Sequence, residues 1–114
     1  MSSNDVYSLM KIIETSVFTK KLKTLLSDED YRLLQNEIIL NPGKGRIIRG
    51  SKGLRKIRWS IPGKGKSGGV RVIYYWVKTK GIILMLLIYS KNEQDDLSGE
   101  QLKMLKSLVE KEFK

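Results

Sequence analysis

The 114-residue sequence predicts one α+β domain, with a small, antiparallel-rich sheet, two N-terminal helices on one sheet face and a C-terminal helix. Two observations support this prediction. An apolar content of 40% with only 2 Pro suits a single core spanning residues 1–114. The periodic patterns follow the order strand, helix, helix, three strands, helix, and neither an internal repeat nor a long linker interrupts them.

The N-terminal part of the chain predicts a strand followed by two helices. Val, Tyr and Ile residues favour a strand over Val6–Glu14. Thr15 or Ser16 can cap a helix that ends near Ser27, and its apolar stripe consists of Phe18, Leu22, Leu25 and Leu26. Ser27 then begins a second helix, whose first turn is acidic and therefore favourable at the positive end of the helix dipole. Asn41-Pro42-Gly43 ends this helix.

The rest of the chain predicts a loop, an antiparallel meander and a last helix. The loop is the Gly-rich and basic segment Gly43–Gly53, and the three strands are Leu54–Ile61, Val70–Val77 and Ile82–Tyr89. The last strand is apolar throughout, which favours a central position covered on both faces. Ser98 and Gln101 form a capping-box pattern at the start of a helix whose apolar side contains Leu102, Leu105, Leu108 and Val109.

Composition excludes several classes of function. The absence of Cys and His rules out thiol catalysis, thiolate metal sites and histidine acid–base chemistry. The longest apolar run, Ile82–Tyr89, is too short for a membrane helix, which needs about 20 residues. No secretory signal is recognisable at the N-terminus. We therefore expect a cytoplasmic protein that has no membrane partner.

The charge distribution is the strongest functional signal. The formal net charge is +10, yet no acidic residue occurs from Ile38 to Asn92. A solvated surface usually mixes both signs, so this segment favours an anion-binding surface over a merely exposed basic face. The segment contains 13 cations, which are Lys44, Arg46, Arg49, Lys52, Arg55, Lys56, Arg58, Lys64, Lys66, Arg71, Lys78, Lys80 and Lys91.

The segment Gly63–Gly69 contains Gly, Lys and Ser but does not fit a phosphate-binding loop of nucleotide hydrolases. Ile61 occupies the position of the first required Gly, and a strand rather than a helix follows. Two readings remain open. The segment is either a flexible hairpin with two exposed lysines, or a loop in which Lys64 and Lys66 contact RNA phosphates.

Strand alternation brings several cations to one sheet face. Lys56 and Arg58 point to the face opposite Ile57, and Arg71 of the next strand is expected to join them. Such like charges repel each other unless an anion enters between them. Nearby aromatic residues either belong to the core or stack RNA bases, with the Tyr75 and Tyr89 hydroxyls at the rim of the site.

The acidic residues after the last strand allow two interpretations. Glu93 and Asp96 either cap the final helix and balance charge, or one of them orients Arg71 or Arg58 through a charge-assisted hydrogen bond.

Three ordered motifs resemble the RelE/HigB superfamily of toxins from bacterial type II toxin–antitoxin modules. These motifs are Gly53–Arg58, Gly63–Tyr75 and Tyr89–Ser98. The likeness extends over residues 10–112 and is closest to the HigB branch. It implies a ribosome-dependent endoribonuclease that cleaves mRNA in the A site of the 30S subunit. It also implies neutralisation by a cognate antitoxin, which we expect to be of the helix-turn-helix type.

The resemblance also suggests which residues act. RNA cleavage requires deprotonation of a 2′-hydroxyl, stabilisation of the phosphorane and protonation of the leaving oxygen. Lys56, whose charged form neighbouring cations disfavour, is the candidate base, and Arg58 and Arg71 would stabilise the phosphate. Lys91 occupies a position where relatives place a basic residue. RNA contacts are expected from Arg55, Lys64, Lys66, Tyr75 and Tyr89, and neither a metal nor another cofactor is expected.

The sequence departs from the family in its last helix, where some relatives carry a tyrosine that stacks on RNA. No tyrosine follows Tyr89, so Tyr89, Tyr75 or the ribosome would replace it. Two alternative functions remain open. The first alternative is a noncatalytic RNA-binding or ribosome-associated module. The second is an inactive toxin relative that acts only in autoregulation of its operon.

Overall fold

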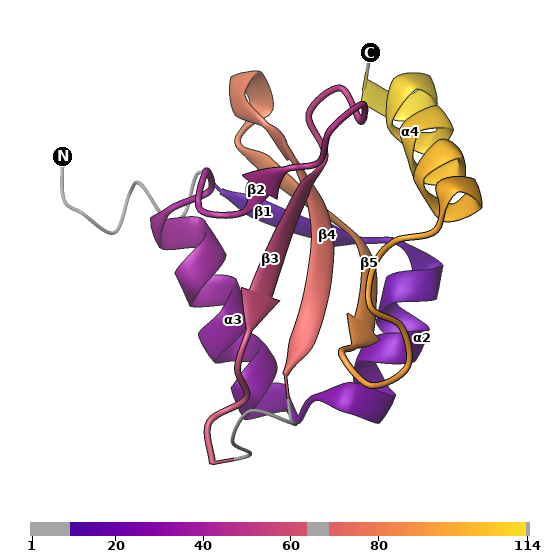
Figure 1. Ribbon diagram of the computed structural model, residues 1–114. Coiled ribbons are helices and arrows are strands. Elements are labelled where there is room, and N and C mark those ends of the chain that lie inside the picture. Colours follow the sequence, from indigo (N-terminus) through magenta and orange to yellow (C-terminus); the bar gives the residue numbers. More distant parts are fainter. Residues whose placement is uncertain (1–9, 64–68, 114) are drawn as a thin grey trace, which may run out of the picture.

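The computed structural model describes residues 10–63 and 69–113, which form a sheet between two helical layers (Figure 1). The predicted α+β fold is confirmed. The strand order is β1-β5-β4-β3-β2, and β1 runs parallel to β5 whereas the other neighbours are antiparallel. The strands are β1 (Lys11–Glu14), β2 (Arg46–Ile47), β3 (Arg55–Trp59), β4 (Val70–Val77) and β5 (Ile82–Ser90). The helices are α2 (Ser16–Leu25), α3 (Asp28–Leu40) and α4 (Gly99–Phe113), and a 3-10 turn, η2 (Lys78–Lys80), joins β4 to β5.

Each helix begins at the cap that the sequence predicts. The Thr15 hydroxyl accepts a hydrogen bond from Phe18 N at 3.0 Å, and the Ser27 hydroxyl accepts one from Asp30 N at 3.1 Å. At the start of α4 the capping box is reciprocal, because Ser98 N donates to Gln101 Oε1 and Gln101 N donates to Ser98 Oγ. These side chains satisfy backbone donors that have no partner within the helix.

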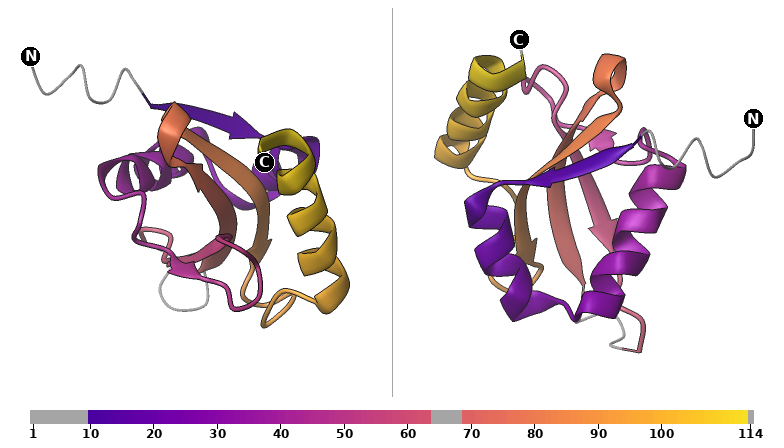
Figure 2. Two further views of the ribbon diagram at one scale, coloured as in Figure 1. Left: turned by 90° about the horizontal axis from the view of Figure 1, so that it is seen from above. Right: turned by 180° about the vertical axis from the view of Figure 1, so that it is seen from behind.

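The sheet separates two apolar clusters. Helices α2 and α3 cover one face, and α4 covers part of the other face, as Figures 1 and 2 show. The first cluster includes Phe18, Leu22, Leu34 and Ile38 of the early helices. The second cluster joins Leu105 and Val109 of α4 to Ile73, Leu87 and Tyr89 of the sheet. No helix in the described part of the chain is long and apolar enough to span a membrane.

Three details differ from the sequence prediction. Within the expected loop Gly43–Gly53, the short strand β2 pairs Arg46 with Lys56 and Ile47 with Arg55. Both β2 residues are exposed and show no alternation, so their pattern could not reveal the strand. Strand β5 is an interior strand buried on both faces, as predicted, but it lies between β1 and β4, and β4 takes the middle position of the five. The expected first strand is observed only as β1, and residues 6–9 lie outside the described residues.

Hydrogen bonds to the Tyr74 hydroxyl hold the loop before β3, and this loop forms one wall of the candidate site. The Tyr74 hydroxyl donates to Pro42 O at 2.7 Å and accepts from Gly45 N at 2.9 Å. A Cβ atom at position 45 would lie only 2.8 Å from the tyrosine ring, so Gly45 permits this close contact. Ser51 closes the far end of the loop by accepting a hydrogen bond from Leu54 N at 3.0 Å.

Candidate functional site

Three polar side chains lie opposite one another on neighbouring strands. In the ladder, Arg58 of β3 pairs with Arg71 of β4, and Arg71 pairs with Tyr89 of β5. Directly opposed residues project to the same face of an antiparallel sheet. This is the face on which α4 packs, and it is also the face of Lys56, as alternation predicted.

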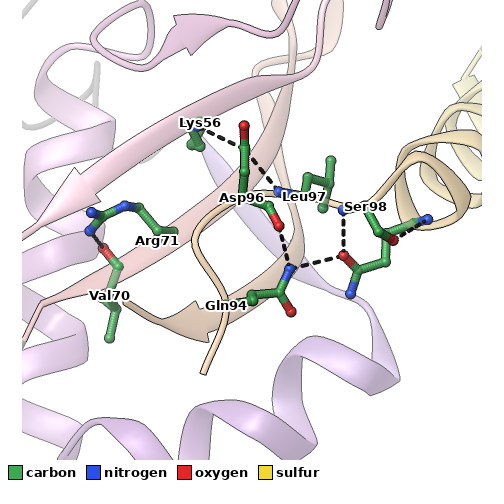
Figure 3. Close-up of polar contacts among 8 residues, drawn as sticks. Lys56, Val70, Arg71, Gln94, Asp96, Leu97 and Ser98 are labelled. Atoms are coloured by element: carbon green, nitrogen blue, oxygen red, sulfur yellow. Dashed lines mark hydrogen bonds and ion pairs between the residues drawn. The ribbon is translucent and has the colours of Figure 1, made fainter. Parts of the chain in front are cut away.

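A small hollow on this face contains three cations. Its volume is about 210 Å³, and it is lined by Arg58, Arg71 and Lys91 together with Trp59, Ser60 and Gly69. Within residues 10–63 and 69–113, none of the three cations forms an ion pair. Among the described residues, the Arg71 guanidinium donates one hydrogen bond, a long contact of 3.5 Å to Val70 O, and Figure 3 shows the guanidinium turned away from Asp96. We refer to this hollow as the cation pocket.

A larger groove adjoins the cation pocket through Arg58, which lines both. The groove has a volume of about 710 Å³ and lies between the segment Lys44–Arg49, strand β3 and the start of α4. Its cations are Lys44, Arg46, Arg49, Lys56 and Arg58, and its apolar lining includes Ile47, Ile48, Leu97 and Leu102. Asp96 is the single acidic residue among these lining residues. We refer to this feature as the basic groove.

Lys56 and Asp96 form an ion pair across the groove (Figure 3). The distance from Lys56 Nζ to Asp96 Oδ1 is 3.0 Å. The hydrogen bond from Lys56, followed by one from Leu97 N, holds the pKa of the Asp96 carboxyl below its ordinary value. In this geometry the Lys56 amine contacts a carboxylate rather than the place where a 2′-hydroxyl would lie, and the role of Lys56 as a base stays a prediction.

The acidic side chains do not pair with the arginines that the sequence suggested. Asp96 holds Lys56 rather than Arg71 or Arg58, and Glu93 forms an ion pair with Lys21 of α2 at 2.8 Å. Hydrogen bonds from Lys21 and from Ser90 N lower the pKa of Glu93. The physical reason is that Glu93 faces the helical layer beside α2, whereas Asp96 lies at the groove.

The tyrosines are more buried than a stacking platform would require. Tyr74 and Tyr89 are 0% and 2% exposed, so neither presents a free ring face to a base. The Tyr89 hydroxyl is also buried rather than at the rim, and it has no hydrogen-bond partner among the described residues. Burial raises the pKa of Tyr89, and Asp96 raises it further, whereas Arg71 and Arg58 lower it.

Two expected RNA contacts lie away from the cation pocket. Arg55 alternates to the opposite sheet face, where its guanidinium donates to Gly43 O at 3.1 Å and Gly45 O at 2.8 Å. Tyr75 is half-buried in the second apolar cluster, and a Cβ atom at Gly53 would lie 3.2 Å from its ring. Lys64 and Lys66 lie outside the described residues.

The structure adds three cations to the candidate site. Lys44, Arg46 and Arg49 line the basic groove, but the sequence placed them only in a basic loop. The absence of acidic residues from Ile38 to Asn92 was the sequence signal for these three cations. It could not show to which side of the molecule they point, because residues in a loop follow no regular period. Within the described ranges, no group of three acidic, His or Cys side chains could hold a metal ion.

Comparison with known proteins supports the fold. No protein-family model matches the chain. Among solved structures, the chain is similar to a double arginine-to-alanine mutant of the E. coli toxin RelE in the free state, with a TM-score of 0.55 and 15% sequence identity. The alignment covers 76% of this chain and 88% of that chain. A likeness at this identity establishes a RelE-like fold.

Proposed function

We propose that the chain is the toxin of a type II toxin–antitoxin system and cleaves mRNA in the ribosomal A site. The observation that carries this proposal is the cation pocket, where Arg58, Arg71 and Lys91 surround a hollow whose described lining residues include no acid. Opposed like charges destabilise a sheet unless an anion lies between them, so this arrangement of cations suits a phosphate ligand. The fold shared with the RelE toxin supports the same function.

The three cations suit the charge that develops during RNA cleavage. The 2′-hydroxyl gives its proton to an acceptor, for which solvent water is available, and its oxygen attacks phosphorus. This attack forms the new P–O bond and places extra negative charge on the phosphorane oxygens. The bond to the 5′ oxygen then breaks, and the leaving oxygen gains a proton. Arg58 and Arg71 would stabilise the phosphorane, and the ammonium groups of Lys91 or Lys56 would protonate the leaving oxygen.

The basic groove offers a path for the RNA strand beyond the scissile phosphate. Arg58 lines both the groove and the cation pocket, so one strand can follow both. Phosphate contacts from Lys44, Arg46 and Arg49 would position the strand without reading its sequence. The described residues form no obvious base that acts without help, so the ribosome would supply the in-line orientation of the 2′-hydroxyl.

The proposed partners follow from this function. The toxin would act in the cytoplasm on mRNA bound to the 30S A site. A cognate antitoxin, of the helix-turn-helix type if the chain belongs to the HigB branch, would silence it. The positively charged groove is a suitable target for an acidic antitoxin segment.

One observation favours a noncatalytic RNA-binding or ribosome-associated module as the second candidate. The Asp96 carboxylate contacts the Lys56 amine at 3.0 Å, and the chain contains no His to serve as a base instead. A module of this kind would retain the cation pocket and the groove but would not cut RNA.

Expression of the chain without a partner tests the proposal. We expect growth arrest in a bacterial host, together with in-frame cuts in translated mRNA that primer extension maps to single positions within codons. Harmless expression of the folded protein, or arrest without cuts, would refute cleavage and favour the noncatalytic module.

A further inference from the structure

The contact between Lys56 and Asp96 has no role in the cleavage chemistry described above, and it lies inside the basic groove. Lys56 is only 20% exposed, whereas Asp96 is 70% exposed, so the carboxylate lies on the solvent side of the pair. A ligand that enters from solvent meets Asp96 before it reaches the lysine. Asp96 therefore repels a polyanion and also occupies the cation that the polyanion would bind.

The segment that carries Asp96 is fixed independently of Lys56. Gln94 Nε2 donates to Asp96 O at 2.8 Å and to Gln101 Oε1 at 3.0 Å (Figure 3). The capping box of Ser98 and Gln101 holds the start of α4, and Leu97 packs in the second apolar cluster. Rotation of the Asp96 side chain away from Lys56 consequently needs no movement of the backbone, and it also breaks the 2.8 Å hydrogen bond from Leu97 N to the same Oδ1 atom.

We infer that Asp96 is a positioning residue that occupies the place of an RNA phosphate on Lys56 in the free protein and is displaced when RNA binds. This inference rests on the proposed function. A phosphodiester carries the same charge as the carboxylate and can contact Arg58 as well as Lys56, because both line the groove. The exchange leaves Lys56 paired throughout, so the groove never holds an uncompensated lysine.

The other polar groups of the site agree with this inference. The carboxyl pKa of Asp96 is lowered, so the residue is a full anion at neutral pH. The Tyr89 hydroxyl, which has no partner among the described residues, lies in the field of Asp96, Arg71 and Arg58. The Tyr89 hydroxyl therefore lies beside the same charged groups that the RNA phosphate would contact.

The test compares two variants that each remove one negative charge from the same connecting segment. Asp96→Asn keeps an oxygen that can accept the hydrogen bond from Leu97 N but weakens the contact with Lys56. Glu93→Gln is the matched control, because Glu93 pairs with Lys21 at 2.8 Å outside the groove. The probe is a short single-stranded RNA with methylated 2′-hydroxyls, which binds without being cut, and affinity is measured by fluorescence anisotropy.

We expect Asp96→Asn to tighten binding about two- to fivefold, as the loss of one partly exposed ion pair implies. Glu93→Gln should have a smaller effect. In a Lys56→Gln background, Asp96→Asn should no longer tighten binding, because Asp96 acts through Lys56. With cleavable RNA on ribosomes, Asp96→Asn should lower KM by a larger factor than it changes kcat, and thermal unfolding would check that all variants fold.

Two results would overturn the inference. Equal effects of Asp96→Asn and Glu93→Gln, or an undiminished effect in the Lys56→Gln background, would show that Asp96 contributes only general charge. If the folded wild type neither binds nor cuts RNA, the proposed function itself fails and this inference fails with it. If the wild type binds RNA and all variants bind equally, only the role of Asp96 is refuted.

Discussion

Replacement of Arg71 by Ala should separate activity from stability. Arg71 contributes little to the fold, because its one hydrogen bond among the described residues is a long contact of 3.5 Å with Val70 O. Arg71 also lies directly opposite Arg58, so its replacement relieves the repulsion between the two cations. This relief should stabilise the fold by about 0.2–1 kcal/mol and offset the loss of the hydrogen bond. We therefore expect the free energy of unfolding of Arg71→Ala to stay within about 1 kcal/mol of the wild-type value.

The effect on cleavage should be much larger. Loss of one group that stabilises charge in the transition state typically costs about 10²–10³ in rate. The assay is single-turnover cleavage of mRNA on programmed ribosomes, with urea unfolding of the same preparations. Arg71→Ala should lower the rate by about this factor at unchanged stability.

Arg55→Ala is the matched control, since Arg55 is on the adjacent strand but on the other sheet face. Its guanidinium donates to two backbone carbonyl oxygens, at 3.1 and 2.8 Å, so its loss should cost about 1–3 kcal/mol of stability. Cleavage per folded molecule should change little. The reasoning is refuted if folded Arg71→Ala cuts at the wild-type rate, or if Arg55→Ala impairs cleavage more than Arg71→Ala does.

Three further predictions concern stability, pH and salt. Tyr74→Phe should lower the free energy of unfolding by about 1–3 kcal/mol in urea titrations, because the Gly45 N–H loses its acceptor. Tyr89→Phe removes a hydroxyl that has no hydrogen-bond partner among the described residues, and it should cost nothing. The lowered carboxyl pKa values of Glu93 and Asp96 imply a contribution to stability that is present above the ordinary carboxyl range, about pH 4. This contribution is lost as the pH falls through the lowered pKa values. A Glu93→Gln/Asp96→Asn double variant should therefore lose less stability than the wild type on acidification. Lys91→Ala should reduce the slope of log affinity for single-stranded RNA against log salt by about 0.7, and Lys23→Ala on α2 should leave it unchanged.

The sequence predicted those features of the fold that depend on local signals. Helix starts at Thr15, Ser27 and Ser98 were recognisable because a cap and its backbone donor are only a few residues apart. The shared face of Lys56, Arg58 and Arg71 was also predictable, because side chains alternate along regular strands. In contrast, β2 has only two exposed residues, and its existence depends on pairing with β3.

The details of the site were less predictable, because they depend on contacts between distant residues. Lys56 and Asp96 are 40 residues apart, and nothing in the local pattern of either residue identifies the other as its partner. Arg55 and Lys56 are neighbours of the same charge, yet their side chains point to opposite faces and serve different purposes. The burial of Tyr89 depends on the packing of α4, so the sequence left open whether its ring was exposed.

Cleavage by the purified chain in a reconstituted translation reaction tests the central claim most directly. Primer extension would compare one mRNA in the presence and absence of ribosomes, for the wild type and for an Arg58→Ala/Arg71→Ala/Lys91→Ala variant whose folding is confirmed by circular dichroism. We predict cuts at A-site codons by the wild type only when ribosomes are present, and none by the variant. Equal cutting of naked mRNA, cutting by the folded variant, or intact mRNA on stalled ribosomes would contradict the claim.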